Sequence, residues 1–388
     1  MANVLGAYNQ VFYAQQALIH LRKELGMASR VYLAMDDDRR VRNRGETITV
    51  RRPSTFTAQS APSSAQDLNT EYVTVTLDQW QEVKFKITDK ELAFTGEQII
   101  QDHIEPAAYA LADAMDQSLA DLYKQIPWLY DYGTATNSSI ITGARQVGRS
   151  INMPLDNRAV SNVHFMVDGT VEGYFLNDSL FHSSQIVGGT QISQETLLRG
   201  GLGTRFGVEN FVNQNTPTHT PGTAAAAGGD GAGALNGAVA IGATSAAVDG
   251  FTGSETLVEG DTFVIAGNTQ RYAVTANVTF STGAGTISFF PAAAQAYADN
   301  AVVTVTQQTA TAHSQQLLFH RDAFAIVTAQ LPTNLPGIDV FAAFDPVTGL
   351  ALRARRFADG DTSTVYQAID ALWGVKTLNA NLGVRAWT

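Results

Sequence analysis

The sequence predicts an α+β protein that carries an inserted all-β domain. One long stretch, Thr95–Ile126, has apolar residues at the three- and four-residue spacing of a helix. Segments on both sides of it alternate between apolar and polar residues, as strands do. From about Gly222 the composition changes abruptly to Ala and Gly, followed by short strand-like runs. These patterns predict a host fold of helices and strands that is interrupted by a β domain.

The bulk composition narrows the function classes. The chain has 388 residues, enough for two or three domains, and a net charge of −11 without a basic domain. A sequence-reading nucleic-acid binder is disfavoured, because phosphate neutralisation needs clustered Lys and Arg. The Arg-rich run Arg39–Arg44 follows Asp36–Asp38, which favours a solvated, locally neutral turn over a phosphate-binding patch. Only 16% of residues are charged, which leaves surface free for protein contacts.

Several cellular contexts are also excluded. The chain has no cysteine, so disulfides, zinc ribbons and thiol chemistry are ruled out. The first ten residues lack the basic and apolar regions of a signal peptide. No window approaches 18 consecutive apolar residues, so no membrane span is expected. We expect a protein that is made in a cytoplasm and stays soluble until it assembles or binds.

Two N-terminal features, a helix and a hairpin, are predicted to need another part of the molecule or a neighbouring molecule to pack against. Tyr8–Leu25 has the spacing of an amphipathic helix, with Gly26 at the expected C-cap. Thr47–Arg52 and Glu71–Leu77 alternate as strands around the polar segment Pro53–Thr70, which predicts a projecting hairpin. An isolated hairpin is marginal in water, so it would need a partner. A mobile surface loop is the alternative interpretation.

The central helix follows a third strand, Glu82–Ile87. Pro106 is expected to begin this helix or to bend it, because its ring excludes a normal backbone hydrogen bond. The polar residues Asp113, Asp116, Asp121 and Lys124 fall off the apolar stripe and are expected to lie mostly toward solvent. The stripe itself consists of Ile104, Ala107, Ala108, Leu111, Met115, Leu119, Leu122 and Ile126.

The later chain continues the α+β pattern. Ser138–Ser150 is predicted as a helix, and Val163–Phe175 as a strand followed by a turn and either a strand or a helix. Gly222–Ala238 is predicted as a flexible linker. Five strands are expected in the insertion, and its flanks PTHTPGTA and TATAHSQQ are expected to meet on one surface. Further host strands are expected within Gln316–Val327 and Gly349–Phe357, and one or two more within Leu372–Ala386, including Leu382–Ala386.

No motif points to catalysis or to a cofactor. The seven histidines lack metal-pair spacing, and there is no H-E-x-x-H, G-x-S-x-G or calcium loop. The tripeptide His320–Asp322 resembles a kinase catalytic loop, but Ala323 and Val327 occupy the positions of its leucine and asparagine, and no DFG follows. We therefore predict no catalytic, cofactor-binding or metal-binding residue. An active site built from distant segments would leave no signal of this kind.

The order of these parts resembles the major capsid (coat) proteins of tailed double-stranded DNA bacteriophages, whose fold is often called the Johnson fold. It is most similar to the short-tailed-phage branch with an inserted β domain. The segments that carry the resemblance are IEPAAYALADAMDQSLADLY, GTRFGVENFVNQNTPTHTPG, LLFHRDAFAIVTAQLP and ALWGVKTLNANLGVRA, with VEGDTFVIAG and GTISFFP inside the insertion.

The resemblance implies a division of the chain. Residues 1–45 would be an N-terminal arm, 46–87 the extended hairpin loop, and 88–160 the peripheral domain with the spine helix. The axial domain would comprise 161–220 and 309–345, separated by an Ala/Gly linker at 221–238 and the inserted β domain at 239–308. Residues 346–388 would return to the peripheral domain.

The resemblance also implies a function without catalysis. Copies would form pentamers and hexamers that close into an icosahedral capsid around double-stranded DNA, without sequence-specific binding. Expected partners are a separate scaffolding protein, a portal protein and, as an optional partner, a decoration protein. Assembly is expected in the host bacterial cytoplasm, with a location in the virion. The alternatives are an encapsulin-like cage and an enzyme with an appended β module.

Two features vary within that family, a covalent cross-link through the hairpin and a maturation cleavage of the N-terminal arm. No lysine lies between Arg52 and Thr70, so we expect no covalent cross-link through the hairpin, and the short arm predicts no large maturation cleavage. The arm and hairpin would reach neighbouring subunits. The candidate contact residues are Phe12, Leu18, Arg51, Arg52, Phe56, Glu71 and Tyr72.

Overall fold

The computed structural model describes residues 10–33, 47–51, 60–61, 72–155, 162–183, 200–225, 232–308, 311–336, 338–344, 350–359 and 364–387. Within these ranges, the side chains of 10–13, 22–24, 51, 87 and 89–102 lie outside the description. The chain divides into two compact units, residues 1–119 with 324–378, and residues 120–323 with 379–388. The Arg-rich run after Asp38 lies outside the described residues.

The first unit contains a six-stranded sheet centred on β23 (Thr364–Thr377). β4 (Gln79–Thr88) pairs antiparallel along one edge of β23. Along the other edge, β22 (Ala351–Asp359) and β20 (Phe324–Ala329) pair with successive parts of the same strand. The sheet is completed by β21 (Asp339–Phe344) next to β22 and by β1 (Tyr32–Leu33), which runs parallel to β20.

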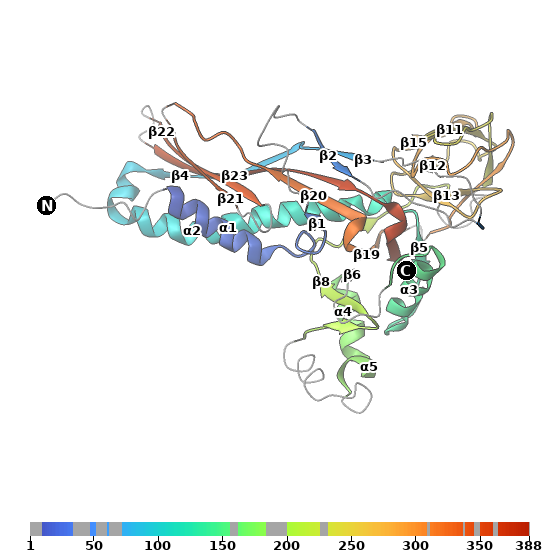
Figure 1. Cartoon of the computed structure of the whole chain (residues 1–388), viewed down its shortest axis with the longest axis horizontal. Coiled ribbons are helices and arrows are strands. Elements are labelled where there is room, and N and C mark those ends of the chain that lie inside the picture. Colours follow the sequence, from blue (N-terminus) through green and yellow to red (C-terminus); the bar gives the residue numbers. More distant parts are fainter. Residues whose placement is uncertain are drawn as a thin grey trace. The chain divides into compact units, whose positions relative to one another are not determined.

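Two helices accompany this sheet, α1 (Gln10–Glu24) and the long α2 (Asp89–Ala120) (Figure 1). α1 packs on β21 and β22, where Leu18 joins Ala14, Ala343 and Ala354 in a small apolar cluster. α2 is held to the sheet through Trp373, whose indole Nε1 donates to Ser118 Oγ at 3.0 Å. The predicted apolar stripe of α2 is confirmed, because its members from Ile104 to Leu119 are all buried.

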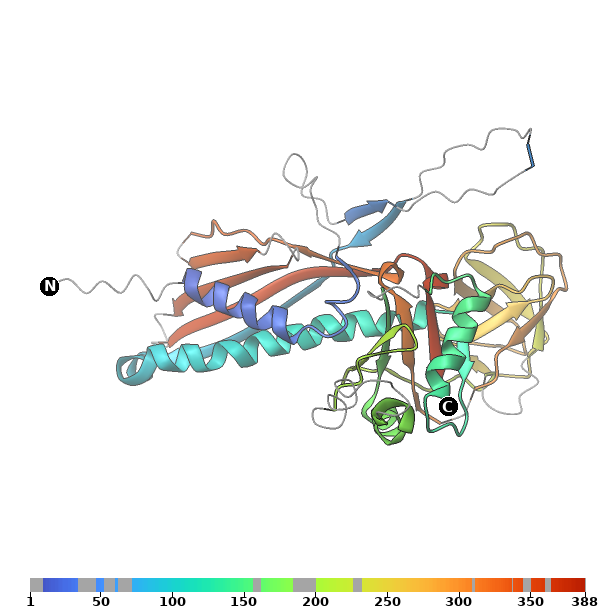
Figure 2. The ribbon, with the colours of Figure 1, turned by 60° about the horizontal axis from the view of Figure 1, so that its bottom comes forward.

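Pro106 was expected either to begin the helix or to bend it, and the first expectation is wrong, while the bend stays a prediction. α2 starts at Asp89 and continues through Pro106 to Ala120, and Figure 2 draws it as one unbroken helix. The proline ring lies on the exposed side of the helix. The carbonyl four residues earlier, which loses its helical donor, can therefore bind water instead. Toward its C-terminal end the helix tightens into the 3₁₀ segment η2 (Asp121–Gln125) instead of remaining α-helical to Ile126.

The prediction that Asp116 faces solvent is also wrong. Asp116 is 4% exposed, and its carboxylate accepts hydrogen bonds from three consecutive backbone N–H groups after α1. Oδ2 accepts from Gly26 at 2.7 Å and Met27 at 3.1 Å, and Oδ1 accepts from Ala28 at 2.8 Å. A buried carboxylate is tolerated where such donors replace its hydration. Asp116 thus fixes the loop that ends the arm helix to α2.

The predicted hairpin is confirmed as the ribbon of β2 (Thr47–Arg51) and β3 (Tyr72–Thr76), which pair antiparallel from Thr47 opposite Thr76 to Arg51 opposite Tyr72. It forms a separate two-stranded sheet next to the main sheet of its unit (Figure 2). Its base packs in an apolar cluster made of Val50, Val75, Leu77, Val327 and Ala329, with Ile48, Leu372 and Leu378 at its margin.

The second unit contains another six-stranded sheet, in the order β5-β24-β19-β6-β8-β7. Its central strand β19 (Gln316–His320) lies antiparallel to both β24 (Gly383–Trp387) and β6 (Val163–Val167). The outer strands are β5 (Leu129–Asp131), β8 (Val208–Val212) and β7 (Thr204–Arg205). The helices are α3 (Ser139–Ser150), α4 (Gly169–Asn177) and α5 (Ser179–His182), with short 3₁₀ turns η3 (Arg321–Ala323) and η4 (Ala380–Leu382).

The helix predicted at Ser138–Ser150 is confirmed as α3, and Val163–Phe175 proves to be a strand followed by a helix. Asp168 caps that helix, because its carboxylate accepts from the Val171 N–H at 2.8 Å. The aromatic rings of Phe175 and Phe181 stack at 5.1 Å in the apolar core between these helices and the sheet.

The insertion is a closed six-stranded barrel in the order β10-β11-β16-β14-β13-β17. Its strands are β10 (Ala232–Leu235), β11 (Ser245–Asp249), β13 (Thr262–Ile265), β14 (Arg271–Val274), β16 (Gly285–Phe290) and β17 (Val302–Val305). A small ribbon of β12 (Thr256–Leu257) and β15 (Val278–Thr279) accompanies it. Aromatic rings fill the barrel interior, where Phe263 and Phe289 meet edge to face at 5.6 Å.

The prediction of a flexible linker throughout Gly222–Ala238 is wrong in part. Ala232–Leu235 forms the strand that closes the barrel between β11 and β17. Ala224 and Ala225 are buried in the barrel core. Small side chains are required at β10, since a Cβ on Gly233 would lie 2.4 Å from the Phe251 ring. At Gly233, the absence of a side chain is therefore a packing requirement. Residues 226–231 of the expected linker lie outside the described residues.

The unit boundaries differ from the expected ones. Residues 120–160 were expected with the spine helix, but they belong to the second unit. Residues 324–345 were expected in the axial domain, but they build the sheet of the first unit. The final strand β24 pairs with β19 and β5 in the second unit and does not return to the first. The sequence pattern predicted β20 and β24 but not β21. The strands that pair with β20 and β24 are distant from them in sequence, which a local pattern cannot show.

We expect Asp116→Asn to lower the free energy of unfolding of the chain by roughly 2–3 kcal/mol, because an amide cannot accept from all three N–H groups and loses the charge that strengthens those bonds. Urea denaturation measures this loss. Asp121→Asn, the same change at an exposed carboxylate, is the matched control and should stay within about 0.5 kcal/mol. Equal effects of the two substitutions would contradict the role given to Asp116.

Candidate functional sites in the hairpin and the barrel neck

The sequence-predicted contact residues fall into three groups. Arg51 and Tyr72 face each other across the hairpin ladder, and Tyr72 is 69% exposed. Leu18 is partly buried against α1's own neighbours β21 and β22. Phe12 lies on α1, but its side chain is outside the description, as is that of Arg51. Arg52, Phe56 and Glu71 lie outside the described residues. The structure therefore brings Arg51 and Tyr72 together and places Leu18 elsewhere in the first unit.

At the base of the hairpin, the backbone that follows β3 lies unusually close to the backbone of β23. A Cβ added to Gly374 in β23 would lie 2.0 Å from the Thr76 carbonyl oxygen and 3.2 Å from the Leu77 Cα atom. The chain that leads from β3 into β4 thus crosses directly over β23, and only glycine leaves room for it. Sequence reasoning did not single out Gly374, whose signal is a glycine inside the apolar strand pattern ALWGVKT.

The second candidate is the neck, which we define as β9 (Thr218–His219) and β18 (His313–Ser314). The chain enters the barrel through β9 and leaves it through β18, and the two strands pair antiparallel with His219 opposite His313. The Gln315 N–H also donates to the Pro217 carbonyl at 2.8 Å. The expectation that the flanks of the insertion meet is confirmed.

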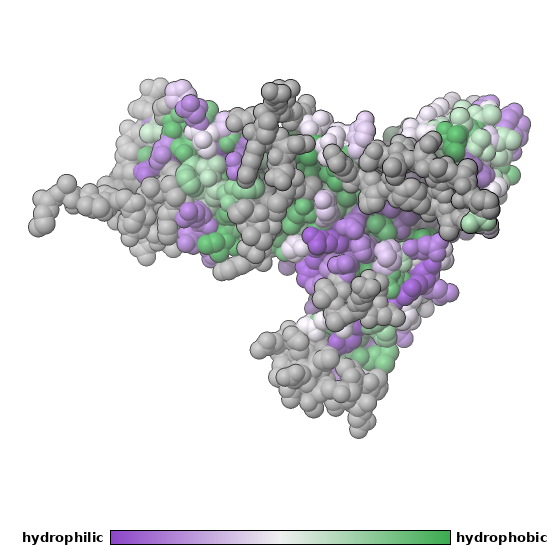
Figure 3. All heavy atoms as spheres, in the orientation of Figure 1, coloured by the Kyte–Doolittle hydropathy of each residue, from purple (hydrophilic) through white to green (hydrophobic). Residues whose placement is uncertain are grey.

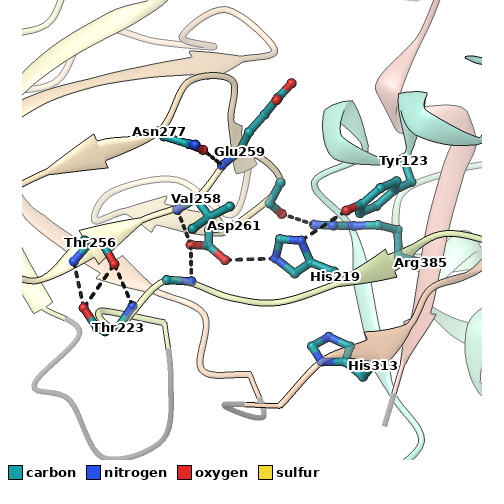
Figure 4. Close-up of polar contacts among 12 residues, drawn as sticks. Tyr123, His219, Thr223, Thr256, Val258, Glu259, Asp261, Asn277, His313 and Arg385 are labelled. Atoms are coloured by element: carbon teal, nitrogen blue, oxygen red, sulfur yellow. Dashed lines mark hydrogen bonds and ion pairs between the residues drawn. The ribbon is translucent and has the colours of Figure 1, made fainter.

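A buried hydrogen-bonded chain joins the neck to the barrel (Figure 4). His219 Nε2 lies 3.0 Å from Asp261 Oδ1, and His219 Nδ1 lies 3.2 Å from the Tyr123 hydroxyl. Because a carboxylate only accepts, Nε2 carries the proton of the neutral ring, and Nδ1 accepts from Tyr123. Asp261 Oδ2 also accepts from the N–H groups of Gly222 and Val258, at 3.0 and 2.7 Å. Asp261 is fully buried and well supplied with donors.

Arg385 joins the last strand of the sheet to the same cluster. Its side chain is completely buried, and Nη2 donates to the Gly260 carbonyl at 2.8 Å. The guanidinium also lies over the Tyr123 ring, 5.7 Å from its centroid. Burial lowers the pKa of Arg385 to about 10, while Tyr123 and Asp261 act in the opposite direction. Arg385 therefore remains charged at neutral pH, with Asp261 as its buried counter-charge.

These groups are suited to holding parts together and not to nucleophilic chemistry. Burial raises the pKa of Tyr123 to about 12, partly offset by Arg385, so its hydroxyl keeps its proton at neutral pH. Among the described residues, no group of three or more His, Asp and Glu side chains could hold a metal ion. No helix in the described ranges is both long and apolar enough to cross a membrane.

Sequence reasoning missed the members of this cluster. Arg385 stands within the short apolar strand pattern LGVRA, and a charge there is a usable signal of a buried partner. His219 and His313 each lie in one of the two flanks expected to meet, which is a second signal. Asp261 follows a glycine in VEGDTF and gives no signal beyond that of a turn.

We expect Asp261→Asn to lower the free energy of unfolding by about 3–5 kcal/mol, because it leaves the buried Arg385 charge without its counter-charge and disturbs three hydrogen bonds. Glu259→Gln is the matched control. Glu259 is 42% exposed and its carboxylate lies 3.9 Å from Lys124 Nζ, so its loss should cost under about 1 kcal/mol. Denaturant melts at pH 7.5 measure both, and a small effect of Asp261→Asn would refute the counter-charge role.

Comparison with known proteins gives a structural likeness only. A scan against protein-family models finds no match, and a search of curated proteins finds none. Among solved structures, one from Mycobacterium phage Che8 aligns with a TM-score of 0.50 at 11% identity, over 93% of this chain and 90% of that one.

Two further structures align less well. The asymmetric unit of the mature capsid of bacteriophage PhiM1 has a TM-score of 0.46 at 10% identity, over 92% of this chain and 84% of that one. The capsid of Ralstonia phage GP4 has a TM-score of 0.46 at 8% identity, over 94% and 88%. The alignment with the Che8 structure extends over both units, and the arm helix, hairpin, long helix and inserted barrel follow one another in the expected order. The protein has the fold of the tailed-phage major capsid proteins.

Proposed function

We propose that this chain is a structural shell protein whose copies assemble as pentamers and hexamers into an icosahedral phage capsid that encloses double-stranded DNA. The observation that carries the proposal is a capsid-type fold with a two-stranded hairpin raised over Gly374. A two-stranded ribbon is marginal in water by itself, so it gains stability when a neighbour covers it.

The hairpin has the features of a contact element. In the described part of the chain, β2 and β3 pair only with each other, so each has an unpaired edge. Tyr72 lies at the end of this ribbon nearest its tip and is largely exposed. Aromatic side chains of this kind are enriched at protein interfaces. We propose Arg51 and Tyr72, with Arg52, Phe56 and Glu71 beyond them, as contacts to a neighbouring subunit.

The surface of the first unit offers further contact area. Large apolar side chains reach solvent at Ile19 on α1, Tyr109 on α2 and Trp80 on β4. On the face shown in Figure 3, apolar residues lie among hydrophilic ones over the first unit. Because only 16% of the chain is charged, little desolvation of ions opposes such contacts. Phe12 and Leu18 of the arm helix would complete the interface.

The proposed environment follows from the same observations. A net charge of −11 suits a container whose lining does not bind phosphate tightly. We propose assembly in the host bacterial cytoplasm with a separate scaffolding protein and a portal protein, and with a decoration protein as an optional addition to the finished virion. No covalent cross-link through the hairpin is proposed, because Arg52–Thr70 contains no lysine.

An encapsulin-like cage is the second candidate, because such a shell would use the same fold. The inserted barrel favours the phage capsid, since that insertion is the feature of the resembling branch. Native particles distinguish the two, because a virion holds double-stranded DNA and a cargo cage holds protein.

Gly374→Ala tests the proposal through the hairpin. Negative-stain microscopy of the wild-type chain, alone and with a candidate scaffolding protein, should show uniform closed shells. We expect Gly374→Ala to reduce shell yield at least about tenfold, because the new methyl group displaces the base of the hairpin. Gly173→Ala is the matched control, since a Cβ there meets nothing within 4 Å.

Circular dichroism of the unassembled subunits should show that both variants keep their secondary structure. A small discrete oligomer of the wild-type chain under all conditions would contradict the shell proposal. Normal shells from Gly374→Ala would contradict the role given to the hairpin.

A further inference from the structure

The neck carries a histidine that is poorly suited to a positive charge. His313 is 6% exposed, and its Nδ1 lies 3.0 Å from the Thr311 carbonyl oxygen. Because a carbonyl oxygen only accepts, Nδ1 must carry the proton of the neutral ring. The other nitrogen, Nε2, is buried and has no hydrogen-bond partner among the described residues. A second proton on His313 would therefore add a charge and an unsatisfied donor in the same place.

The charges around His313 make that proton more costly. The His219 ring meets His313 edge to face at 5.9 Å, and the permanently charged Arg385 lies in the same cluster. Burial lowers the pKa of His313 below its usual 6.5, and electrostatic interaction with His219 and Arg385 lowers it further. The hydrogen bond to Thr311 and the carboxylate of Asp131 act in the opposite direction.

The neighbouring elements contribute few compensating charges. The barrel supplies Asp261, which is already bonded to His219, Gly222 and Val258, and Glu259, which faces Lys124. The segment η2 supplies Asp121, Tyr123 and Lys124. The cluster thus contains one buried negative charge, the Asp261 carboxylate. It faces the positive charge of Arg385 and two histidines that could each take up a further proton.

Because His313 lies in the neck, a positive charge on its ring would affect the attachment of the barrel. Both crossings between the barrel and the rest of the second unit run through the neck, and His313 is paired directly with His219 there. We propose that the neck is an acid-sensitive hinge, in which protonation of His313 loosens the attachment of the barrel to the sheet of the second unit. The inference concerns the single subunit and holds whether or not the chain forms a shell.

The sign of the effect follows from linkage. The loosened neck binds a proton on His313 more readily than the closed neck does, because its imidazole is hydrated. The closed neck is therefore most stable above the usual pKa of 6.5, and it loses stability as the pH falls below that value. Raising the pH again should restore the closed neck, because its opening breaks no covalent bond.

Hydrogen–deuterium exchange of the full chain at pH 7.5 and 5.5, corrected for intrinsic rates, tests the hinge. We expect the amides of 218–220, 222 and 313–316 to exchange at least about threefold faster at pH 5.5, while those of the barrel strand β16 stay protected. His313→Gln cannot take up the proton and should remove this difference. His103→Gln, at an exposed position in the first unit, should leave it unchanged.

A second measurement keeps the test sharp if His313→Gln folds poorly. The Trp387 ring lies 4.9 Å from that of His313, so an imidazolium there should quench its fluorescence. The Trp387 signal is the difference between wild type and Trp387→Phe, and it should fall between pH 7.5 and 5.5. Equal exchange at the two pH values, a pH effect that persists in His313→Gln, or a flat Trp387 signal would each overturn the hinge.

Discussion

The first unit depends on one close approach, the passage of the backbone at Thr76 and Leu77 over Gly374. Any side chain at this position would place its Cβ 2.0 Å from the Thr76 carbonyl oxygen, which leaves no alternative to glycine. This contact lets β4 pair along β23 while β3 turns away to form the hairpin. The apolar cluster around Val75 and Val327 then holds the base of the hairpin in place. Because Gly374 has no side chain, β4 can complete the sheet beside β23 while β3 remains in the hairpin, where a partner can reach it.

Buried polar groups specify the rest of the arrangement. Asp116 joins the end of the arm helix to α2 through three backbone N–H donors. Asp261 joins the barrel to the neck through the His219 imidazole and two backbone N–H donors. Each carboxylate is more than 95% buried, so a structure that left it unpaired would carry a large desolvation cost. Apolar side chains can pack in many arrangements of helices and barrels. A buried carboxylate is stable only in an arrangement that places hydrogen-bond donors around it. We infer that the two carboxylates select the observed arrangement.

The sequence predicted helices and strands, whose patterns involve neighbouring residues. It did not predict contacts between residues that are far apart in the chain. The apolar stripe of α2, the alternation of β2 and β3 and five of the six barrel strands could be predicted, because periodicity reflects one buried face. Asp116 could not, because its donors lie about 90 residues earlier in the chain. The strand Ala232–Leu235 was mistaken for a linker because tight packing and flexibility both favour small residues. The site residues Phe12, Arg52, Phe56 and Glu71 were chosen from their position in the resemblance, and their side chains lie outside the description.

We propose that the hairpin of one subunit is stabilised by a neighbouring subunit in a closed shell. A cryo-electron microscopy reconstruction of assembled particles tests it most directly. The expected map shows β2 and β3 covered by another copy of the chain, with Tyr72 in the interface. A shell in which the hairpin packs only on its own subunit, with Tyr72 open to solvent, would contradict the claim.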